Sequence, residues 1–574
     1  MLYERRTSQP ENPFSKLVSQ QTIAIVPEFT LESGHKLYQV PVAYKTWGKL
    51  NDAGDNVMII CHALSGSCDV EDWWGPLMGP GRAFDPTKFF IICCNVLGSP
   101  YGTASPVTID PVTGVTYGPE FPLATIRDDV TLHKLILDDL GVKQVAICIG
   151  GSMGGMQVLE WSFFGPDYVR AIVPIATSAK HSAWCISWGE AQRQSIYSDP
   201  NYKDGYYTPD APPSVGLGAA RMAALLTYRS RNSFESRFGR KVMDKPTYSS
   251  AKEPETPAEE HHQIHNDGHR HTKGPMPRSS SADSTSSLLA ASSKALELAQ
   301  QQQQQQQITE DGVTVEAASS GQKTLLSDPL ASSTTTTIAT GPAAVSAMTA
   351  ATTATSDSTS AASAAADGHT TLSPSSPPSS PPANGGLVSS STTIPVSNGA
   401  TPISIPIEKR LRTSRPTVFS AQNYLRYQGD KFIHRFDANC YIAITRKMDV
   451  HDVSTGRSGG VAEGGVGGSV YDVLESIVQP ALVIGVESDG LFTISEQYEL
   501  AEHLHAAEMV VIQSPDGHDG FLLEFEQINH AILSFMHKHR HLVDILSREG
   551  FVAPAAVGEV VKESLFGESE IVNW

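Results

Sequence analysis

The stretch Cys148-Ile149-Gly150-Gly151-Ser152-Met153-Gly154-Gly155 decides the fold class of this 574-residue chain. It holds the pattern Gly-x-Ser-x-Gly, with an apolar β-type run at 144–148 before it and a helical run at 156–161 after it. A serine between small residues at a strand-to-helix turn predicts a nucleophile elbow, which lifts the hydroxyl out of the edge of a sheet. The alternative is a glycine-rich turn that carries a solvated serine, because so short a pattern also recurs by chance.

The two partners that a serine nucleophile needs follow in the required order, an acid and then a histidine. The apolar run 481–486 predicts a buried parallel strand, and Asp489 comes directly after it. A second strand, predicted over 509–512, leads to His518. Both side chains therefore follow strand ends at the edge where open α/β sheets bind ligands. Taken singly, Asp489 could cap a helix and His518 could occupy a turn, but together behind Ser152 they indicate a catalytic triad.

An oxyanion hole is predicted beside the serine. The strand expected at 57–61 is followed by a loop at 62–67, from which this type of fold lends a backbone N–H to the developing negative charge. We assign the two donors to Leu64 or its neighbour and to Met153, the residue after the nucleophile. His62 stands just before the loop, and we interpret it as structural rather than as the base.

The composition excludes several classes of partner. The formal net charge is −19 at pH 7, which argues against binding to nucleic acid or another polyanion. No apolar run approaches the roughly 20 residues that a membrane-spanning helix requires. Residues 1–7 lack the apolar segment of a secretory signal. We therefore expect a cytoplasmic protein with neither a nucleic-acid nor a membrane partner.

The cysteines and histidines do not predict a metal site. The chain has seven cysteines, an odd number with no Cys-x-x-Cys, and most lie in predicted apolar strands, where cysteine behaves as a small hydrophobe. This pattern fits a reducing compartment. One histidine cluster has neither cysteines nor regular ligand spacing beside it, so we expect no metal there. Its members are His261, His262, His265, His269 and His271.

Composition also divides the chain. From about 20 to 245, predicted strands alternate with helical stretches such as 127–137, which predicts a mostly parallel sheet with helices on both faces. Serine, threonine, alanine, proline and glycine then dominate, with a glutamine run at 300–307. Such a segment buries too little apolar surface to offset its ordering entropy. Globular composition returns at Val418.

We interpret the helical stretches on either side of the low-complexity segment as a lid over Ser152, with the segment as an insertion within the lid. A long insertion in a surface loop costs little closure entropy, because that cost grows only with the logarithm of loop length. The predicted boundaries are 20–180 for the first part of the core, 181–246 for the first part of the lid, 247–414 for the disordered insertion, 415–477 for the second part of the lid and 478–545 for the rest of the core.

Longer motifs carry a resemblance to a known family. They include His-Ala-Leu-Ser-Gly-Ser at 62–67, Asp-Trp-Trp at 72–74, Gly-Leu-Gly-Ala-Ala-Arg-Met at 216–222, Thr-Tyr-Arg-Ser at 227–230 and Gly-His-Asp at 517–519. In these stretches, which span about 20–245 and 416–540, the chain resembles homoserine O-acetyltransferase of the α/β-hydrolase superfamily, in its fungal form with a long insertion. Ser65 departs from the threonine that is frequent in the family, which bears on the pocket wall rather than on the triad.

The resemblance implies an α/β-hydrolase fold and a ping-pong acetyl transfer from acetyl-CoA to the hydroxyl of L-homoserine, a step towards methionine. It implies Ser152 as nucleophile, His518 as base and Asp489 as the residue that orients His518. It also implies that Arg221 holds the homoserine carboxylate and Asp519 its amino group, roles that suit a planar guanidinium and a carboxylate. Without the motif, Arg221 would be interpreted as an exposed helix arginine.

Three further expectations come with the resemblance. Acetyl-CoA is a co-substrate, and no cofactor is permanently bound. The substrates are small molecules, and the chain forms a homodimer through the lid helices. The alternatives are the same fold with another acceptor or donor (serine, deacetylcephalosporin C or succinyl-CoA), a plain esterase, or a non-catalytic interaction protein built around the insertion, which would have no need for an intact triad.

Overall fold

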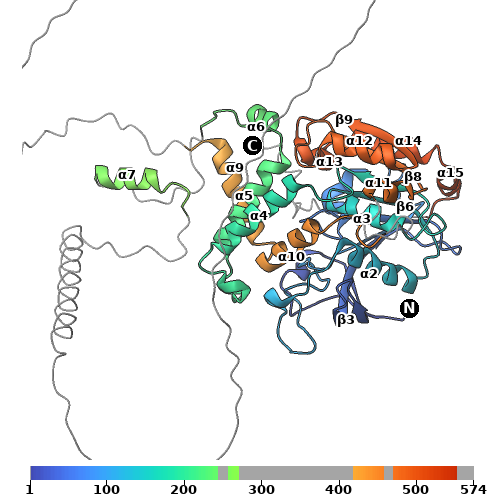
Figure 1. Ribbon diagram of the computed structural model, residues 1–574, viewed down its shortest axis with the longest axis horizontal. Coiled ribbons are helices and arrows are strands. Elements are labelled where there is room, and N and C mark those ends of the chain that lie inside the picture. The colour runs from blue at the N-terminus through green and yellow to red at the C-terminus, as the bar shows by residue number, and fades with distance from the viewer. Residues whose placement is uncertain (1, 243–255, 270–417, 458–468, 552–574) are drawn as a thin grey trace, which may run out of the picture. The chain divides into compact units, whose positions relative to one another are not determined.

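A nine-stranded sheet forms the centre of the computed structural model, which describes residues 2–242, 256–269, 418–457 and 469–551 (Figure 1). The order of the strands is β1-β2-β3-β5-β4-β6-β7-β8-β9. Their bounds are β1 Glu4–Arg6, β2 Thr22–Thr30, β3 Lys36–Trp47, β4 Val57–Cys61, β5 Phe90–Cys94, β6 Val145–Gly151, β7 Ile172–Ile175, β8 Pro480–Val486 and β9 Ala506–Ile512.

The helices fall into two groups by their place in the sequence. Those outside the interval between β7 and β8 are α1 Val70–Trp74, α2 Ile126–Asp139, α3 Met153–Ser162, α12 Ile494–His503, α13 Gly520–Leu523, α14 Phe525–Met536 and α15 Arg540–Ser547. Those within that interval are α4 Ala183–Tyr197, α5 Ser214–Tyr228, α6 Arg231–Arg237, α7 Pro257–His265, α9 Ser420–Ile433, α10 Ala438–Asp449 and α11 Val470–Glu475.

The prediction of a mostly parallel sheet is confirmed, since β5, β4, β6, β7, β8 and β9 all pair in parallel. The N-terminal strands are different. β1, β2, β3 and β5 pair antiparallel, and β1 begins before the predicted start of the core at residue 20. Gly34 adopts φ +80° in the short β2–β3 turn, a conformation that glycine tolerates best. The pattern gave no strand assignment to this hairpin.

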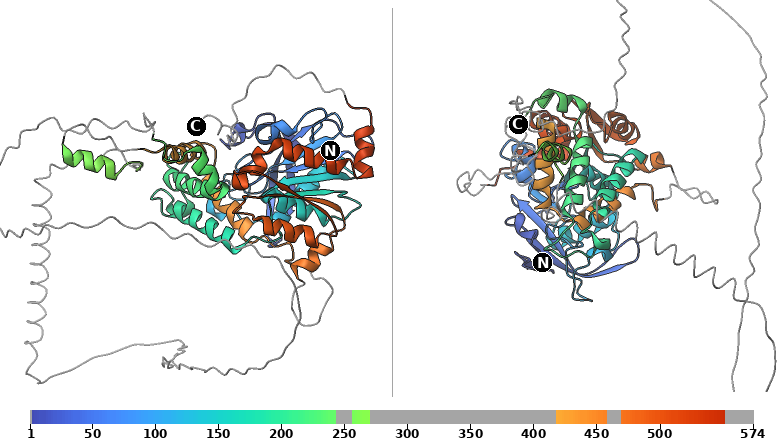
Figure 2. Two further views of the ribbon diagram at one scale, coloured as in Figure 1. Left: turned by 90° about the horizontal axis from the view of Figure 1, so that it is seen from above. Right: turned by 90° about the vertical axis from the view of Figure 1, so that its left-hand side faces the viewer.

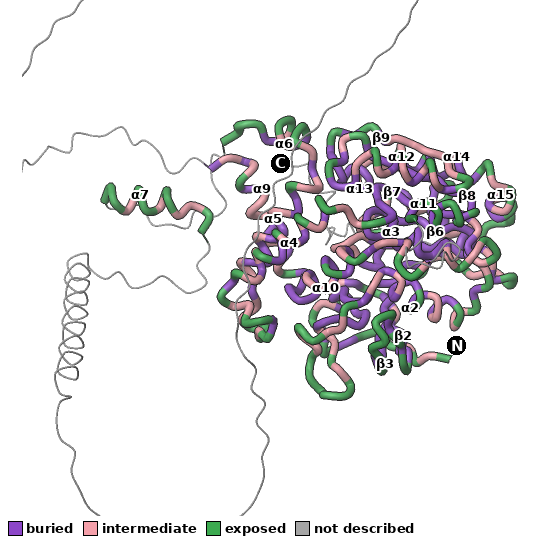
Figure 3. Tube along the Cα trace, viewed as in Figure 1, coloured by how far each residue is buried: buried purple, intermediate pink, exposed green. Residues whose placement is uncertain are grey.

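Both faces of the sheet are buried, as Figure 3 shows for the central strands. Along β4, Met58 and Ile60 join one apolar cluster, whereas Val57, Ile59 and Cys61 join the other. Alternate residues of a strand point to opposite faces, so these are the two cores of a sheet covered on both sides. Residues of α14 and α15 belong to the first cluster, and residues of α2, α11 and α12 to the second.

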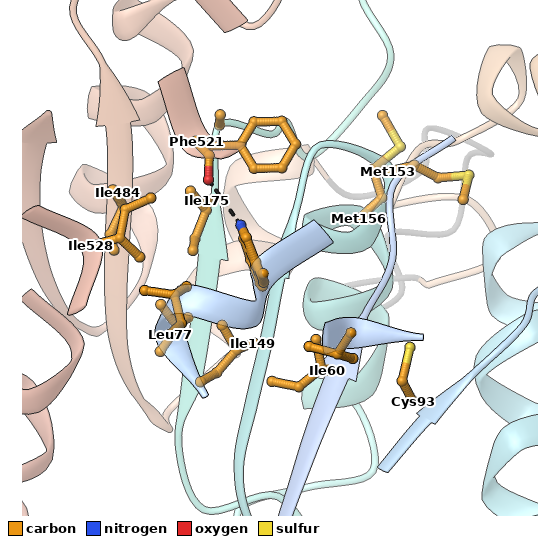
Figure 4. Packing of buried hydrophobic residues seen from close by; sticks show 14 of the residues in the cluster. Ile60, Leu77, Cys93, Ile149, Met153, Met156, Ile175, Ile484, Phe521 and Ile528 are labelled. Atoms are coloured by element: carbon orange, nitrogen blue, oxygen red, sulfur yellow. Dashed lines mark hydrogen bonds between the residues drawn. The ribbon is translucent and has the colours of Figure 1, made fainter. Parts of the chain in front are cut away.

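The first core supports the end of β6, where the serine stands. Figure 4 shows Ile149, Ile175 and Ile484 from neighbouring strands packed with Phe521 of α13. The dashed line is the indole N–H of Trp74 donating to the carbonyl oxygen of Phe521, over 3.0 Å. Close packing of this kind fixes the positions of the loops that leave the strands.

Helices α4, α5, α9 and α10 form a second layer of structure beside the sheet. Helix α5 packs against α4 and α9, and α4 also contacts α10 (Figure 2). An aromatic group holds the end of α9 to α10, with Phe432 stacked on Phe436 at 5.1 Å and both rings edge-on to Tyr441. Helix α11 differs, because Val473 and Leu474 pack in the second core of the sheet.

One helix corrects the prediction for 247–414. Residues 257–265, predicted to be disordered, form α7, which begins after Thr256; the Thr256 side chain accepts a hydrogen bond from the N–H of Glu259. Such a cap, with Pro257 at the first helical position, stabilises a helix start that composition alone does not reveal. The rest of the predicted insertion lies outside the described residues, apart from positions 256 and 266–269.

The two chain ends that flank this interval meet directly. Val242 and Phe419 form an isolated antiparallel bridge, and the N–H of Ser420 donates to the carbonyl oxygen of Lys241 over 2.9 Å. Beyond this junction, the ion pair between Asp267 and Arg426, at 2.8 Å, links the two sides. An ion pair that is partly exposed contributes about 0–1 kcal/mol to stability.

Replacing 244–417 with a linker of about four Gly and Ser residues is therefore expected to leave the melting temperature and the activity nearly unchanged, because a hairpin loop of that length spans such a bridge. Differential scanning calorimetry and a steady-state assay measure the two quantities. A deletion variant that does not fold, or that folds and loses most of its activity, would show that this interval is part of the enzyme.

Three buried histidines predict how the fold responds to acid. Burial lowers the pKa of His62 to about 4, that of His133 to about 3 and that of His451 to about 4. A histidine with a depressed pKa in the folded state stabilises the fold above its unfolded pKa of about 6.5, and this contribution is lost as the pH falls towards 4. Within that window, each such group changes the free energy of unfolding by about 1.4 kcal/mol per pH unit.

We therefore expect the free energy of unfolding, measured with urea between pH 7.5 and 4.5, to fall steeply below pH 6.5. His133→Gln removes one of these groups. It is expected to lower the number of protons taken up on unfolding by about one, which makes the slope of the unfolding free energy against pH shallower. An unchanged slope would contradict the assignment of His133 as buried and neutral.

Candidate active site

Ser152 occupies the sharp turn between β6 and α3, with φ 58° and ψ −126°. A non-glycine residue in this conformation costs about 1–3 kcal/mol and persists only where the surroundings enforce it. A Cβ atom on Gly154 would collide with the carbonyl oxygen of Cys61, and one on Gly150 would collide with the backbone of Gly154. The glycines at both ends of the motif are therefore needed for the turn to pack against β4.

The structure brings the three predicted triad residues together. The Nε2 atom of His518 lies 2.9 Å from Oγ of Ser152, and its Nδ1 atom lies 2.7 Å from Oδ2 of Asp489. The other oxygen of Asp489 accepts hydrogen bonds from the N–H groups of Leu491 and Phe492, at 2.8 and 3.0 Å. All three side chains are almost completely buried. Asp489 thus both caps its own loop and orients the histidine.

The two predicted oxyanion donors lie beside this serine. Met153 is the first residue of α3, where a backbone N–H has no acceptor within the helix. The 62–67 loop contains a turn closed by the N–H of Gly66 donating to the carbonyl oxygen of Ala63 over 2.9 Å, so Leu64 is an inner residue of that turn. Leu64 and Ser152 both line one cavity. The assignment of Leu64 and Met153 as oxyanion donors stays a prediction, which their place at this cavity and at the start of α3 allows.

His62 is structural, as the sequence indicated. Its Nδ1 atom is 2.9 Å from the carbonyl oxygen of Ala63, and its Nε2 atom accepts a hydrogen bond from the N–H of Val96 over 3.1 Å. The ring is fully buried, and that burial keeps it neutral, with a pKa of about 4. It joins the 62–67 loop to the chain after β5.

The cavity over Ser152 is built from both groups of helices and their flanking loops. Its lining includes Gln192 of α4, Tyr228 of α5 and Met448 of α10, together with His518 and Asp519. Aromatic side chains form much of the remaining wall, namely Trp73, Trp188, Phe492 and Phe521. A cavity walled mainly by apolar and aromatic groups with a few polar groups suits a small organic substrate. These walls limit the access of water to Ser152.

One thiol in the cavity wall is not a rival nucleophile. Cys185 lies on α4, and its Sγ atom contacts the carbonyl oxygen of Leu491 at 3.2 Å. Burial raises the pKa of this thiol to about 12, so it is protonated at neutral pH. Because the thiolate is the reactive form of cysteine, Ser152 remains the nucleophile of the cavity.

The two predicted substrate anchors differ in position. Asp519 lines the cavity next to His518. Arg221 is buried on α5 with its guanidinium over the rings of Tyr228 and Phe432, at 5.5 and 5.0 Å, and it is not among the residues that line the cavity. Tyr228 thus both lines the cavity and contacts Arg221. Sequence reasoning quoted Tyr228 within a motif but assigned it no role.

No group of three or more His, Cys, Asp or Glu side chains among the described residues is arranged to hold a metal ion, and His271 of the predicted histidine cluster lies outside those residues. No helix in the described ranges has the length and apolar character needed to cross a bilayer.

The fold and the triad define an α/β-hydrolase with a serine nucleophile. In agreement, the family model of the alpha/beta hydrolase fold matches residues 56–309. The chain is 49% identical to homoserine O-acetyltransferase of Ascobolus immersus, over 100% of this chain and 97% of the relative. It is 48% identical to homoserine O-acetyltransferase of Saccharomyces cerevisiae, over 98% and 96% of the two chains. The chain belongs to the homoserine O-acetyltransferase family.

Solved structures support the fold but do not separate the activities. Homoserine O-acetyltransferase from Bacillus anthracis aligns with a TM-score of 0.54 and 18% identity, covering 93% of this chain and 99% of that one. Esterase E22 aligns equally well, with a TM-score of 0.54 and 18% identity over 90% and 99% of the two chains. The same scaffold thus carries both transfer and hydrolysis, and the site must decide between them.

Proposed function

We propose that this enzyme transfers the acetyl group of acetyl-CoA to the side-chain hydroxyl of L-homoserine, a step of methionine biosynthesis, through an acetyl ester on Ser152. The observation that carries the proposal is the Ser152–His518–Asp489 array in a cavity that also exposes Asp519, in a chain nearly half identical to homoserine O-acetyltransferases. No permanently bound cofactor is needed, because acetyl-CoA serves as the co-substrate.

In the first half-reaction, Oγ of Ser152 attacks the thioester carbonyl while Nε2 of His518 takes its proton, a transfer for which the 2.9 Å separation is suitable. Asp489 holds the Nδ1–H of the ring and stabilises the imidazolium that forms. The N–H groups of Met153 and Leu64 bind the oxyanion. His518 then returns the proton to the departing thiolate, and CoA leaves.

In the second half-reaction, homoserine replaces CoA, and His518 takes the proton of its hydroxyl as that oxygen attacks the acetyl carbon. The bond between the acetyl carbon and Oγ of Ser152 then breaks, His518 returns the proton to Oγ, and the acetylated homoserine leaves. Asp519 binds the ammonium group beside His518. Asp519 lines the cavity beside His518, and its ion pair with Arg229, at 2.7 Å from Oδ2, holds the carboxylate in place. Arg221 binds the homoserine carboxylate next to Tyr228, which lines the cavity and lies 5.5 Å from its guanidinium.

The main rival is a plain esterase, in which water takes the place of homoserine. An esterase needs no anchor for an amino acid, whereas this cavity places a carboxylate directly beside the catalytic histidine. The decisive experiment incubates the protein with acetyl-CoA or succinyl-CoA, with and without homoserine, and follows free CoA. Rapid release from acetyl-CoA only when homoserine is present supports the proposal, whereas equal release without homoserine would favour an esterase.

Replacing Arg221 with alanine is expected to weaken homoserine use by about 2–5 kcal/mol in kcat/KM, the usual cost of truncating one partner of a buried charge pair. Acetylation of Ser152 by acetyl-CoA alone is expected to change little, because that half-reaction does not involve homoserine. Single-turnover measurements separate the two steps. Equal losses in both half-reactions would assign Arg221 to folding or to CoA binding instead.

The resemblance also carries a quaternary proposal and a location. We propose a homodimer formed through the lid helices, which present Trp184 of α4 and Leu226 of α5 as exposed apolar side chains. Exposed side chains of this size are frequent at subunit contacts. Light scattering on the purified chain tests the dimer. The proposed location is the cytoplasm, where buried cysteines that form no disulfide, as these seven, are usual.

A further inference from the structure

The catalytic histidine stands on a short loop that must be held from both sides. This loop runs from Ser514 to Gly520, between β9 and α13. On the side of the sheet, Oγ of Ser488 donates to the carbonyl oxygen of Ser514 over 2.6 Å and accepts from the N–H of Gly517 over 2.9 Å. These two bonds fix the loop to the end of β8, close to Asp489.

On the other side, a single guanidinium spans the loop. Arg229 directly follows α5, and its side chain is only 3% exposed. Its Nη1 atom donates to Oδ1 of Asp516 over 3.0 Å, and its Nε atom lies 2.7 Å from Oδ2 of Asp519. Arg229 thus contacts the residue two before His518 and the residue one after it.

The backbone reinforces this contact. Gly517 adopts φ +69°, and a Cβ atom there would come within 2.5 Å of the backbone nitrogen of Ser230. The turn before His518 therefore lies directly against the end of α5. Any shift of that end would be transmitted to the histidine, because little free space separates the two segments.

On this side of the loop, Asp516 accepts hydrogen bonds from several side chains. Besides Arg229, it accepts from Oγ of Ser233 over 2.5 Å and from Arg237 over 3.0 and 3.1 Å. Burial acts to raise the pKa of Asp516, but the hydroxyl of Ser233 and the two arginines outweigh burial and hold that pKa below its usual value. Asp516 is therefore a carboxylate at neutral pH. Arg237 is more exposed than Arg229, and its guanidinium reaches Asp516 from the surface side.

We propose that Arg229 is a positioning residue for catalysis, which holds the His518 loop from the end of α5 and so sets the distance between His518 and Ser152. The inference rests on the proposed function only for the identity of the acyl donor. A planar guanidinium is required, because its extended fork donates to Asp516 from one nitrogen and forms an ion pair with Asp519 at another, whereas the ammonium of lysine is a single point charge.

The test compares Arg229→Lys and Arg229→Gln with Arg237→Gln, which removes a cation from the same Asp516. Stopped-flow release of CoA measures acetylation of Ser152, and hydrolysis of p-nitrophenyl acetate measures the same Ser152 and His518 chemistry without CoA or homoserine. We expect both Arg229 variants to lose at least tenfold in the acetylation rate while KM for acetyl-CoA changes less than twofold. Arg237→Gln is expected to lose less than threefold.

Folding is checked by melting temperature and near-UV circular dichroism. If Arg229→Gln does not fold, because it leaves Asp516 and Asp519 without their shared cation, Arg229→Lys and the double variant Arg229→Gln/Asp516→Asn decide the question. Wild-type acetylation rates in folded Arg229 variants, or equal losses in Arg237→Gln, would overturn the inference. A wild-type enzyme that hydrolyses p-nitrophenyl acetate but ignores acetyl-CoA would instead overturn the proposed function, and the effect of Arg229 would still be measurable.

Discussion

Replacing Ser152 with alanine is expected to lower kcat by about four to six orders of magnitude, as in other enzymes that depend on a serine triad. The reason is that the variant lacks the atom that carries the acetyl group, while His518 and Asp489 keep their positions. Mass spectrometry of the wild-type protein with acetyl-CoA alone should show an acetyl group on Ser152, and the variant should show none.

Ser162→Ala is the matched control. This second serine lies at the end of the same helix, is buried, and donates to the carbonyl oxygen of Leu159 over 2.6 Å, away from the cavity. In the Ser162→Ala variant, Ser152 should be acetylated at the wild-type rate. An acetyl group found on another residue of the wild type, or efficient turnover by Ser152→Ala, would exclude Ser152 as the nucleophile.

Replacing Lys447 with methionine is expected to lower the free energy of unfolding by about 3–5 kcal/mol, because it leaves a buried carboxylate without its cation. Lys447 of α10 donates to both oxygens of Asp129 on α2, over 2.8 and 2.6 Å, and to the carbonyl oxygen of Leu97 over 2.6 Å. Burial raises the pKa of Asp129 to about 6 despite this partner, and burial lowers the pKa of Lys447. Urea denaturation at pH 7.5 measures the loss.

The double variant Lys447→Met/Asp129→Asn is expected to recover much of that stability, since neither remaining group is charged. Lys134→Met serves as a surface control, because Lys134 pairs with Asp138 on an exposed part of the same α2 and should cost at most about 1 kcal/mol. If the single and double variants were equally unstable, the packing of the lysine stem rather than the buried charge would explain the effect.

The triad was predictable because its geometry follows from sheet topology. Parallel strands end at one edge, so residues placed just after β6, β8 and β9 converge there even though Ser152 and His518 are 366 positions apart. The elbow also has a local signature, since the backbone at Ser152 leaves no space for side chains at Gly150 and Gly154.

Contacts between side chains from separate helices were not predictable in the same way. Arg229 and Asp516 are 287 positions apart, and no periodicity indicates that the end of α5 lies against the His518 loop. The contact of Arg221 with Phe432 depends likewise on how α5 packs against α9. The β2–β3 hairpin was unassigned because its register depends on pairing with β5 rather than on local pattern.

Because Val242 and Phe419 are paired in a bridge, a foreign domain can be inserted into the chain between them. The chain leaves the sheet and its helices after Val242 and returns at Phe419, and these two residues are neighbours, as at the end of a β-hairpin. A fluorescent reporter whose own two ends lie close together can be placed there without separating α6 from α9. The position lies away from the residues that line the cavity, so such a chimera should keep the acetylation rate of the wild-type enzyme.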